Sequence, residues 1–557
     1  MIGKITRGLV LVRLLVSMPV DMLAQTAVWT GSYDNNRTGA NINETILTPA
    51  NVTAGQFGKL AAVSVSGCIF AQPLYVSGII GSDGNSRDLF FVATATNMVY
   101  AFDANDYSLY FSANFGHPVS TADVDPEKGY YAFADCDAGD GLGPIGIVGT
   151  PVIDVANSAM YFVANTADSA GQHHFLHKMD LASGKDLGSP VEIGGSYAGT
   201  PFQAKFHLQR SALLLLNQRI YVTFASHQDQ TPYGGWMFSY DTNLNQVAVM
   251  SYSPGKSGAG IWQSGGGPAS DGQSIYFSTG NLPEDEADPT DNSDSILKVD
   301  PDTLIVQAKT SFYPEDIKWD ENFDLDLGSS RTIVIPGTTL VASGSKYGDL
   351  FVVDQGGMQL DSRTQVAARH SAGYDWTGVY NGFAYWNNIF FIWPGGGGYI
   401  NGTDPGFPTD TLKAFFLDPN SGAVTLLANG QSDGVGVGYQ GSNIVISANG
   451  YDPSTAILWA HTPNSNTSWL QPADLHAYSA GDFSNGILHE LWNNIGLDPA
   501  DAGAFLAKFS APLIANGKVF LPTFSGKVIV YGLLPTTDTP PLDPAAKKTP
   551  RAARRQR

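Results

Sequence analysis

Several short polar stretches of this sequence place side chains suited to ligand binding directly before, or at the start of, short apolar runs. HLQR before SALLLLN is one example. Imidazole, guanidinium, amide and indole groups at equivalent points of a repeated fold would converge into a polar funnel with aromatic walls. The alternative is that they bond to each other or to backbone and hold neighbouring repeats together. The candidates are His207, Gln209, Arg210, Trp262, Gln263, Asp326, Arg331, Tyr380 and Asn381.

The acidic stretch EDEADPTDNSD, residues 284–294, indicates a second kind of chemistry. Its carboxylates suit a hard cation such as calcium, which takes about six to eight oxygen ligands. The spacing is not that of an EF-hand, because no glycine stands at the turn and no glutamate follows at the twelfth position. A solvated acidic loop is the alternative. The candidate ligands are Glu284, Asp285, Asp288, Asp291, Asp294 and, from the nearby DLDLGSS, Asp324.

His173, His174 and His177 form an H-H-x-x-H cluster. Neutral imidazoles at this spacing can share a transition metal. Neither an HExxH motif nor a cysteine accompanies them, so we expect surface histidines in a loop of the second repeat. A nucleophile elbow, a Walker loop and a Rossmann fingerprint followed by a helix are all missing from the sequence.

The elements that must position these groups are short strands. The chain has 557 residues with 62 Gly, 29 Phe and 24 Tyr, and only 15% of its residues are charged. Between residues 57 and 535 no long apolar segment with a 3.6-residue period occurs, so helix should be scarce. Turn-rich, aromatic-rich composition favours an all-β fold, and the length requires several domains or a large repeat architecture.

Groups of four short apolar runs recur along the chain, and the third run of most groups ends in an acidic residue. These residues lie 54 to 77 positions apart, a spacing that suits four-stranded β-propeller blades with insertions. We predict an all-β propeller of eight antiparallel blades, with seven as the alternative. The acidic residues are Asp103, Asp180, Asp241, Asp300, Asp354 and Asp418.

The eighth group, Ser510–Gly532, supplies only three strands, separated by Asn-Gly and Ser-Gly turns. Phe57–Gly67 alternates as a single strand with no group of its own. We expect it to complete the last blade, which closes the ring and removes an exposed strand edge. The predicted organisation is a signal-peptide-like segment (1–25), an extended lead-in (26–56), the propeller (57–535) and a disordered basic, Pro-rich tail (536–557).

KMDLASGKDLG and FFLDPNSGAVTLL resemble the docking repeat of pyrroloquinoline-quinone-type propellers, roughly A-x-D-x-x-T-G-x-x-x-W. Asp180 and Asp418 match its aspartate, whereas its tryptophan is missing from nearly every copy. A group of uncharacterised secreted propeller proteins is similar at longer strings, such as GIWQSGGGPASDG and KFSAPLIANGKVFLPTFSGKVIVYG. The resemblance implies the propeller fold and, for its enzymes, a quinone and calcium on the axis.

The net charge and the N-terminal segment indicate which partners the protein can have and where it is located. The net charge is −21, which disfavours nucleic acid. Lys4 and Arg7 precede an apolar run typical of a secretory signal peptide, so we expect a secreted or periplasmic protein with no other membrane segment. Cys68 and Cys136 could pair there or stay as buried thiols.

The function that we favour from the sequence is a monomeric, non-catalytic binding propeller, with a protein, glycan or small molecule at the polar funnel. A pyrroloquinoline-quinone and calcium-dependent dehydrogenase is the alternative. Against it stand the missing docking tryptophans and the lack of adjacent cysteines, which several such enzymes place against the quinone. A glycan-active lyase or hydrolase is a second alternative, for which the sequence singles out no carboxylate pair.

Overall fold

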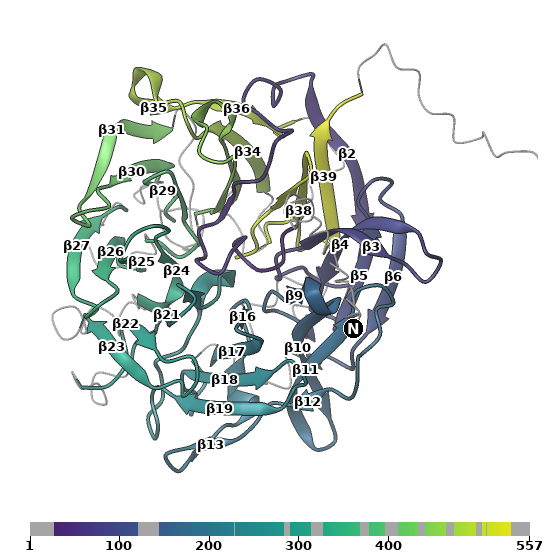
Figure 1. Cartoon of the computed structure of the whole chain (residues 1–557), viewed down its shortest axis with the longest axis vertical. Coiled ribbons are helices and arrows are strands. Elements are labelled where there is room, and N and C mark those ends of the chain that lie inside the picture. Colours follow the sequence, from purple (N-terminus) through teal and green to yellow (C-terminus); the bar gives the residue numbers. More distant parts are fainter. Residues whose placement is uncertain are drawn as a thin grey trace, which may run out of the picture.

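The computed structural model describes residues 27–120, 144–227, 229–282, 290–312, 327–367, 378–395, 410–432, 441–463, 473–496, 504–507 and 509–535. Over these ranges the chain forms strands, short 3-10 turns and loops, with no α-helix. Eight sheets surround a central axis as the blades of a propeller, each built on four antiparallel strands, with a short fifth strand on three of them (Figure 1). The prediction of eight blades is confirmed, and the alternative of seven is excluded.

In each of the first four blades the strands follow one another from the innermost outward. Blade 1 is β3 (Leu74–Ile80), β4 (Ser86–Ala93), β5 (Met98–Asp103) and β6 (Leu109–Asn114); blade 2 is β9 (Val152–Asp154), β10 (Ala159–Asp168), β11 (Gly171–Asp180) and β12 (Val191–Glu192). Blade 3 is β16 (Leu214–Leu216), β17 (Arg219–Ser226), β18 (Trp236–Asp241) and β19 (Gln246–Ser251), with β15 (His207–Leu208) also on β17; blade 4 is β20 (Ala269–Ser270), β21 (Ile275–Ser278), β22 (Ser295–Val299) and β23 (Val306–Ser311).

The other four blades have the same order. Blade 5 is β24 (Thr332–Val334), β25 (Leu340–Gly344), β26 (Asp349–Asp354) and β27 (Leu360–Gln365); blade 6 is β28 (Ala384–Trp386), β29 (Ile389–Ile392), β30 (Lys413–Leu417) and β31 (Val424–Ser432). Blade 7 is β32 (Asn443–Ser447), β33 (Ile457–Pro463), β34 (Ala473–Ser479) and β36 (Glu490–Asn493); blade 8 is β37 (Leu513–Ala515), β38 (Lys518–Pro522), β39 (Lys527–Leu533) and β2 (Phe57–Ser64). Short pairs are β7 (Val119–Ser120) with β8 (Pro144–Ile145), and β13 (Ser196–Tyr197) with β14 (Thr200–Pro201).

The hydrophobic core lies between the blades. Successive side chains of a strand point to opposite faces of its sheet, and both faces of a blade are covered by neighbours. On β38, Val519 packs against blade 7 with Trp459, whereas the next residue, Phe520, packs against blade 1 with Phe90. Inner strands of such blades must therefore be apolar at nearly every position, which explains the continuous apolar runs in the sequence.

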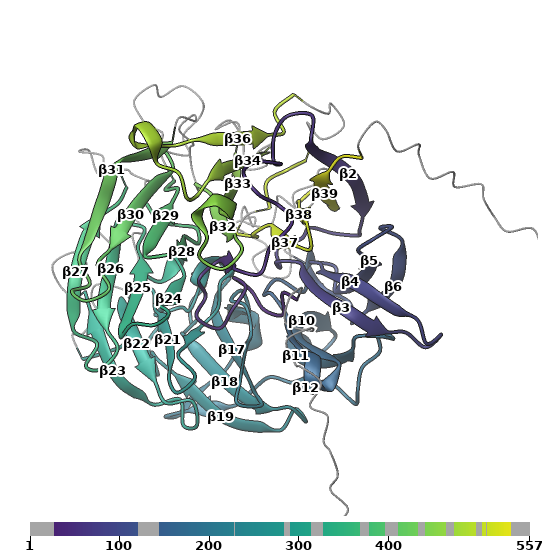
Figure 2. The ribbon, with the colours of Figure 1, turned by 45° about the horizontal axis from the view of Figure 1, so that its top comes forward.

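The ring closes through β2. This strand pairs antiparallel with β39 from Phe57 opposite Leu533 to Ser64 opposite Lys527, and it forms the outer edge of blade 8. The closure predicted from the three-stranded last group is thus confirmed. Figure 2 shows the purple β2 beside the yellow β39, so strands from early and late in the sequence complete one blade.

The lead-in before β2 runs along the central axis rather than outside the ring (Figure 1). Its backbone carbonyls accept hydrogen bonds from inner strands of successive blades. Bonds of this type join Trp29 to Ile153, Asn35 to Ser270, Asn36 to Val334, Thr38 to Tyr385 and Gly39 to Ile446. Val28 also forms a β-bridge with Tyr75, and β1 (Ala40–Asn41) pairs parallel with β32. Side chains of the lead-in make the remaining contacts with backbone carbonyls: Asn35 with Leu215, Tyr33 with Pro512, and Asn41 with Ile514. All eight blades are therefore bonded to this one segment.

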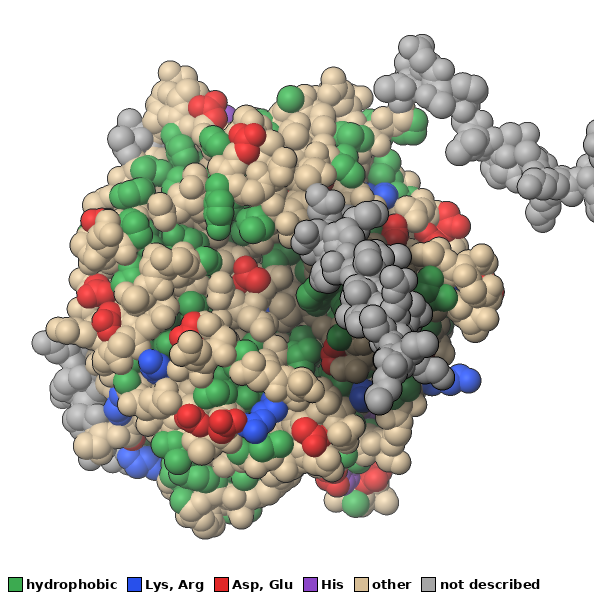
Figure 3. All heavy atoms as spheres, in the orientation of Figure 1, with side chains coloured by type: hydrophobic (Ala, Val, Ile, Leu, Met, Phe, Trp, Pro, Cys, Tyr) green, Lys and Arg blue, Asp and Glu red, His purple; other side chains and the backbone are tan. Residues whose placement is uncertain are grey.

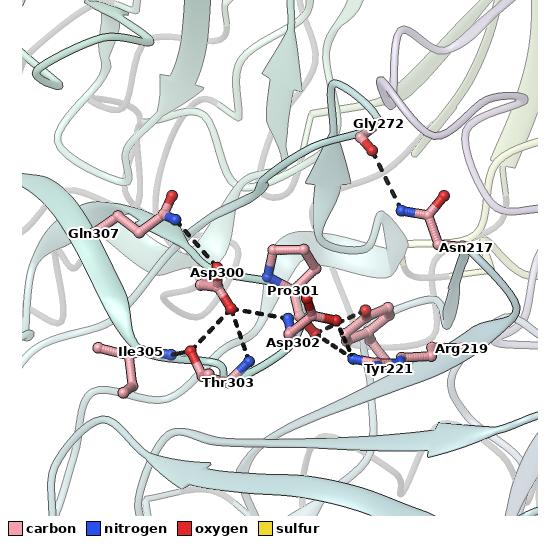
Figure 4. A network of polar contacts seen from close by, with 10 residues as sticks. All are labelled: Asn217, Arg219, Tyr221, Gly272, Asp300, Pro301, Asp302, Thr303, Ile305 and Gln307. Carbon is pink, nitrogen blue, oxygen red and sulfur yellow. Dashed lines mark hydrogen bonds and ion pairs between the residues drawn. The ribbon is translucent and has the colours of Figure 1, made fainter.

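The regularly spaced aspartates occupy equivalent turns after the third strand. Asp300 accepts hydrogen bonds from the backbone and hydroxyl of Thr303 at 2.8 and 2.9 Å (Figure 4). The next residue, Pro301, offers its carbonyl to the Tyr221 hydroxyl of blade 3 at 2.9 Å. Blades 2 and 3 are joined in the same way, since Tyr161 donates to the Thr242 carbonyl. Tyrosine donors thus link blade 2 to blade 3 and blade 3 to blade 4 at this turn.

Two expectations about individual segments are wrong. The three histidines lie on β11, not in a loop, and His174 and His177 are buried on opposite faces of that strand, against Phe224 and Phe115 respectively. The run ILHELWN was expected to be one strand of blade 7. Instead β35 (Ile487–Leu488) pairs parallel with β31 of blade 6, and only β36 belongs to blade 7.

No helix in the described ranges is long and apolar enough to cross a membrane. Acidic and basic side chains are scattered over the face shown in Figure 3. The predicted signal segment and basic tail lie outside the described residues. Cys68 is buried and carries a disulfide, and the chain's other cysteine, Cys136, lies outside the described ranges.

Candidate functional site

The predicted funnel residues lie where expected along the chain, at the entries to the inner strands of blades 3 to 6. His207 is on β15, Arg210 precedes β16, and Arg331 precedes β24. Trp262 is half-buried, and the other described candidates are less than 9% exposed. Asp326 lies outside the described residues. Whether any of these side chains binds a ligand stays a prediction.

Arg210 joins the entries to blades 3, 8 and 1 at the channel mouth. Its guanidinium carbon lies 4.2 Å from the ring centre of Phe509, before blade 8, and 5.9 Å from that of Phe70, before blade 1. Such cation–π contacts contribute about 0.5–2 kcal/mol each, and more when they are desolvated. Arg210 is 8% exposed, so this contact holds blades 3, 8 and 1 together.

The loop before blade 4 crosses the same mouth. The Gln263 amide donates to the Ser278 carbonyl at 2.9 Å and accepts from the Thr332 backbone at 3.1 Å. The Ser264 hydroxyl contacts the carbonyl oxygens of Ser329 and Tyr380. A Cβ at Gly265 would overlap with the backbone carbonyl of Phe509, so only glycine permits this approach. The loop from Gln263 to Gly265 therefore crosses the channel mouth, as far as the structure describes it.

Beneath this loop, the lead-in places charged groups on the axis. Burial lowers the pKa of Arg37 and of Arg331 to about 10, and Asp34 opposes the effect on both. Burial also raises the pKa of Asp34, against its hydrogen bonds from Thr38. Nε and Nη1 of Arg331 have no hydrogen-bond partner among the described residues.

A separate hollow, the blade 3 groove, opens beside His207. It has a volume of about 300 Å³. Its walls come from the β13–β14 hairpin, the turn before β18 and the segment after β19. The lining residues are Thr200, Pro201, Gln203, His207, Pro232, Tyr233, Gly234, Trp236, Ser251, Ser253, Gly255, Lys256 and Ser257.

Three polar side-chain atoms in this groove surround the space where Gly234 lacks a side chain. Measured from the position that a Cβ of Gly234 would take, Ser253 Oγ lies at 3.0 Å, Trp236 Nε1 at 3.4 Å and Ser251 Oγ at 3.8 Å. Trp236 stands directly opposite Ser251 in the β18–β19 pair, which places their side chains on one face. Ser251 is 1% exposed, and its hydroxyl has no hydrogen-bond partner among the described residues.

His207 holds the glycine at the centre of the groove. Its Nδ1 donates to the Gln203 carbonyl at 2.7 Å, and its Nε2 accepts the backbone N–H of Gly234 at 3.1 Å. These bonds require the neutral imidazole with the proton on Nδ1. Burial lowers the pKa of His207 to about 4, and it lowers the pKa of the neighbouring His174 and His227 to about 4 and about 3. The base of the groove is therefore uncharged near neutral pH.

A larger groove of about 760 Å³ lies at the seam between blades 7 and 8, and several of its polar groups are already hydrogen-bonded within the chain. Asn494 donates to the Tyr531 hydroxyl at 3.1 Å and accepts from the Leu475 backbone. Glu490 contacts His476 at 2.6 Å. The seam groove thus shows closed internal bonding, whereas the blade 3 groove presents an unpaired hydroxyl.

The candidate calcium ligands are only partly described. Asp291 contacts Lys256 at 3.4 Å and accepts from the Ser293 backbone, and Asp294 accepts from the backbone of Leu327. Glu284, Asp285, Asp288 and Asp324 lie outside the described residues. Within the described ranges no three His, Cys, Asp or Glu side chains are grouped to hold a metal ion. Calcium binding by the acidic loop stays a prediction.

Sequence reasoning selected His207 but missed Gly234, Trp236, Ser251 and Ser253. The string PYGGWMFSYD offered one signal, because two glycines before a tryptophan leave space beside a large aromatic donor. The serines carried no such signal, since their place opposite Trp236 depends on the strand register.

No protein-family model matches this chain, and no curated protein matches it. Solved structures do share its fold. Quinohemoprotein alcohol dehydrogenase ADHIIG from Pseudomonas putida HK5 superposes with a TM-score of 0.56 at 13% identity, over 93% of this chain and 83% of that one. The quinohemoprotein alcohol dehydrogenase of Comamonas testosteroni has the same TM-score and identity, over 93% and 82% of the two chains. A europium-containing methanol dehydrogenase gives 0.51 at 13% identity, over 91% and 98%. At this identity the likeness shows the fold of quinoprotein dehydrogenases and nothing of the activity.

The described residues do not fit a quinone on the axis. A planar tricarboxylate such as pyrroloquinoline quinone needs an open slot at the channel mouth. There the Gly265 backbone lies against the Phe509 carbonyl, and Ser264 contacts the carbonyls of Ser329 and Tyr380. Among the described residues, the loop with Ser264 and Gly265 thus occupies the space that the cofactor would need.

Proposed function

We propose that this protein is a non-catalytic binding propeller that holds a small, oxygen-rich ligand in the blade 3 groove. The observation that carries the proposal is the set of three polar atoms around the space over Gly234. Ser251 Oγ is buried without a partner among the described residues, and such an atom costs about 1–3 kcal/mol unless a ligand or water satisfies it. A ligand hydroxyl that approaches Gly234 from this side would face these three atoms.

The scaffold suits this role because Arg37, the buried cation of the lead-in, is used in internal bonds. Arg37 alone donates to the carbonyls of Pro268, Gly31 and Leu213. A rigid ring with a small side groove presents its polar atoms without rearrangement, which lowers the entropic cost of binding.

Substitution of the central glycine tests the proposal. Gly234 does not have a positive φ, so alanine can take its backbone conformation, and the added methyl group would fill the space that the ligand needs. Gly194→Ala is the matched control, because a Cβ there meets no atom within 4 Å and the backbone φ is again not positive.

Ligand-observed NMR with a library of small alcohols, amides, carboxylates and sugars would compare the full-length wild type with both variants. We expect at least one compound class to bind the wild type and Gly194→Ala but not Gly234→Ala, and to be recovered unchanged by mass spectrometry. Equal binding to all three proteins would refute the assignment of the groove, and conversion of the bound compound would refute the non-catalytic role.

A quinoprotein dehydrogenase is the second candidate, supported by the fold shared with quinohemoprotein alcohol dehydrogenases. Addition of pyrroloquinoline quinone and calcium to the purified protein, followed by absorbance and melting temperature, separates the two functions. We expect no bound-quinone spectrum. A quinone spectrum together with dye reduction would replace our proposal with the oxidoreductase.

A further inference from the structure

We infer that the ligand of the blade 3 groove is a neutral saccharide of one or two rings. This inference rests on the proposed binding function and names its ligand class. Four features of the groove carry it: its charge, its hydrogen-bonding groups, its apolar walls and its size.

The charge of the groove favours an uncharged ligand. None of the residues that line it is acidic, and the buried His207 imidazole is neutral where its Nε2 accepts the backbone N–H of Gly234. The one lining cation, Lys256, lies 3.4 Å from the Asp291 carboxylate, which offsets its charge. An anion would also approach a chain whose net charge is −21. A neutral ligand needs no counter-charge in the groove and is not repelled by the net charge of the chain.

The hydrogen-bonding groups favour hydroxyls over carbonyls. The indole N–H of Trp236 can only donate, whereas the Ser251 hydroxyl can donate and accept. Ser253 Oγ already donates to the Gly258 carbonyl at 2.9 Å, which leaves its oxygen as an acceptor. A carbonyl ligand would satisfy only the donors. Adjacent hydroxyl groups of a sugar ring both donate and accept, so they match this mixed set.

The apolar walls suit the C–H face of a sugar ring. Pro201, Pro232 and the Tyr233 ring line the groove beside the polar atoms. Trp236 is fixed by ring contacts with Phe202 at 5.6 Å and Phe238 at 5.9 Å, so its N–H points in one direction. A wall of this kind with few fixed polar groups is typical of small-ligand sites.

The size limits the ligand. The volume of about 300 Å³ is at the small end of the range for ligand pockets, roughly 300–1,000 Å³. One or two sugar rings fit such a space, whereas a long glycan would extend past the rim formed by Thr200 and Ser257.

Saturation-transfer difference NMR on the full-length protein tests the inference. The probes are glucose, galactose, mannose, N-acetylglucosamine, maltose and cellobiose, with succinate and N-acetylglycine amide as non-sugar probes. We expect at least one sugar to bind the wild type and Gly194→Ala, to bind Ser251→Ala about five- to tenfold more weakly, and not to bind Gly234→Ala. Melting curves show whether each variant is folded, and Ser251→Ala serves if Gly234→Ala is not.

The other outcomes each have a consequence. If succinate or the peptide amide binds and is lost in Gly234→Ala while no sugar binds, the saccharide inference fails and the binding function stands. If sugars bind Gly234→Ala and Ser251→Ala as they bind the wild type, the groove is not their site and the inference fails. If no probe distinguishes Gly234→Ala from Gly194→Ala, both proposals fail.

Discussion

Arg37 is the side chain whose loss should reveal how much the lead-in stabilises the ring. Its guanidinium is fully buried and donates to the carbonyls of Pro268 at 3.0 Å, Gly31 at 2.8 Å and Leu213 at 3.0 Å. It also donates to the Thr30 hydroxyl at 2.7 Å. Arg37→Met keeps most of the volume and removes every one of these bonds.

The expected size of the effect follows from two opposing contributions. Three buried carbonyls left without their donor cost about 1–3 kcal/mol each, or about 3–9 kcal/mol together. Removal of a buried cation recovers part of this, because burial lowers the pKa of Arg37 from 12.5 to about 10, a desolvation cost of roughly 3 kcal/mol. We therefore expect Arg37→Met to lower the free energy of unfolding by about 3 kcal/mol.

Guanidinium chloride unfolding followed by tryptophan fluorescence measures this difference. The control is Arg87→Met, which breaks a partly exposed pair with Asp83 and should cost less than about 1 kcal/mol. If both variants lose the same stability, or Arg37→Met loses none, the axial segment does not hold the blades together as we describe.

Three further outcomes test other parts of the structure. Deletion of residues 27–67 removes β2 and the lead-in and should sharply lower the melting temperature; an unchanged value would contradict the closure. Because the pKa values of His174, His207 and His227 lie below the usual 6.5, the unfolded chain takes up their protons first as the pH falls. The buried His461 adds a fourth such group, since burial lowers its pKa to about 3. Stability is therefore full above about pH 6.5 and should fall, by on the order of 5 kcal/mol per unit, between about pH 6 and 4; denaturant unfolding at pH 7, 6 and 5 would reveal a flat profile if this is wrong. Tyr221→Phe removes the bond to the turn of blade 4 and should cost about 1 kcal/mol in urea unfolding, with no cost if the turn is held by packing alone.

The architecture could be predicted because it depends on local patterns that recur. Asp180, Asp241 and Asp300 each accept backbone N–H groups in an equivalent turn, so the spacing between them gave the number of residues per blade. The missing fourth strand of the last group likewise required a partner, and Phe57–Gly67 was the one unassigned strand. The residues of the turns and the number of strands were therefore sufficient to predict a closed ring of eight blades.

The path of the lead-in could not be predicted, because its polar, aperiodic sequence carries no strand signal. Its backbone groups find partners on inner strands that lie up to several hundred residues away, such as Ile446 for Gly39. The same limit applied to His174: the sequence shows the cluster, but the neighbouring side chains that cover each face of β11 decide which imidazoles are buried.

The blade 3 groove could not be predicted from the sequence, for a related reason. Trp236 and Ser251 face each other only because the β18–β19 register shifts by one irregular position between Ser239 and Tyr240. The space between them also depends on the close approach of the chain at Gly234 and Gly258. Register and backbone approach are properties of the folded hairpin, which composition does not specify.

The most direct test of the account is the indole N–H signal of Trp236. In protein labelled with ¹⁵N-tryptophan, its cross-peak can be assigned with Trp236→Phe among the ten tryptophans of the chain. A sugar that binds in the saturation-transfer experiment should shift this one peak strongly in the wild type and in Gly194→Ala, and leave it unchanged in Gly234→Ala. A peak that stays in place at saturating sugar, or that moves equally in Gly234→Ala, would contradict binding over Gly234.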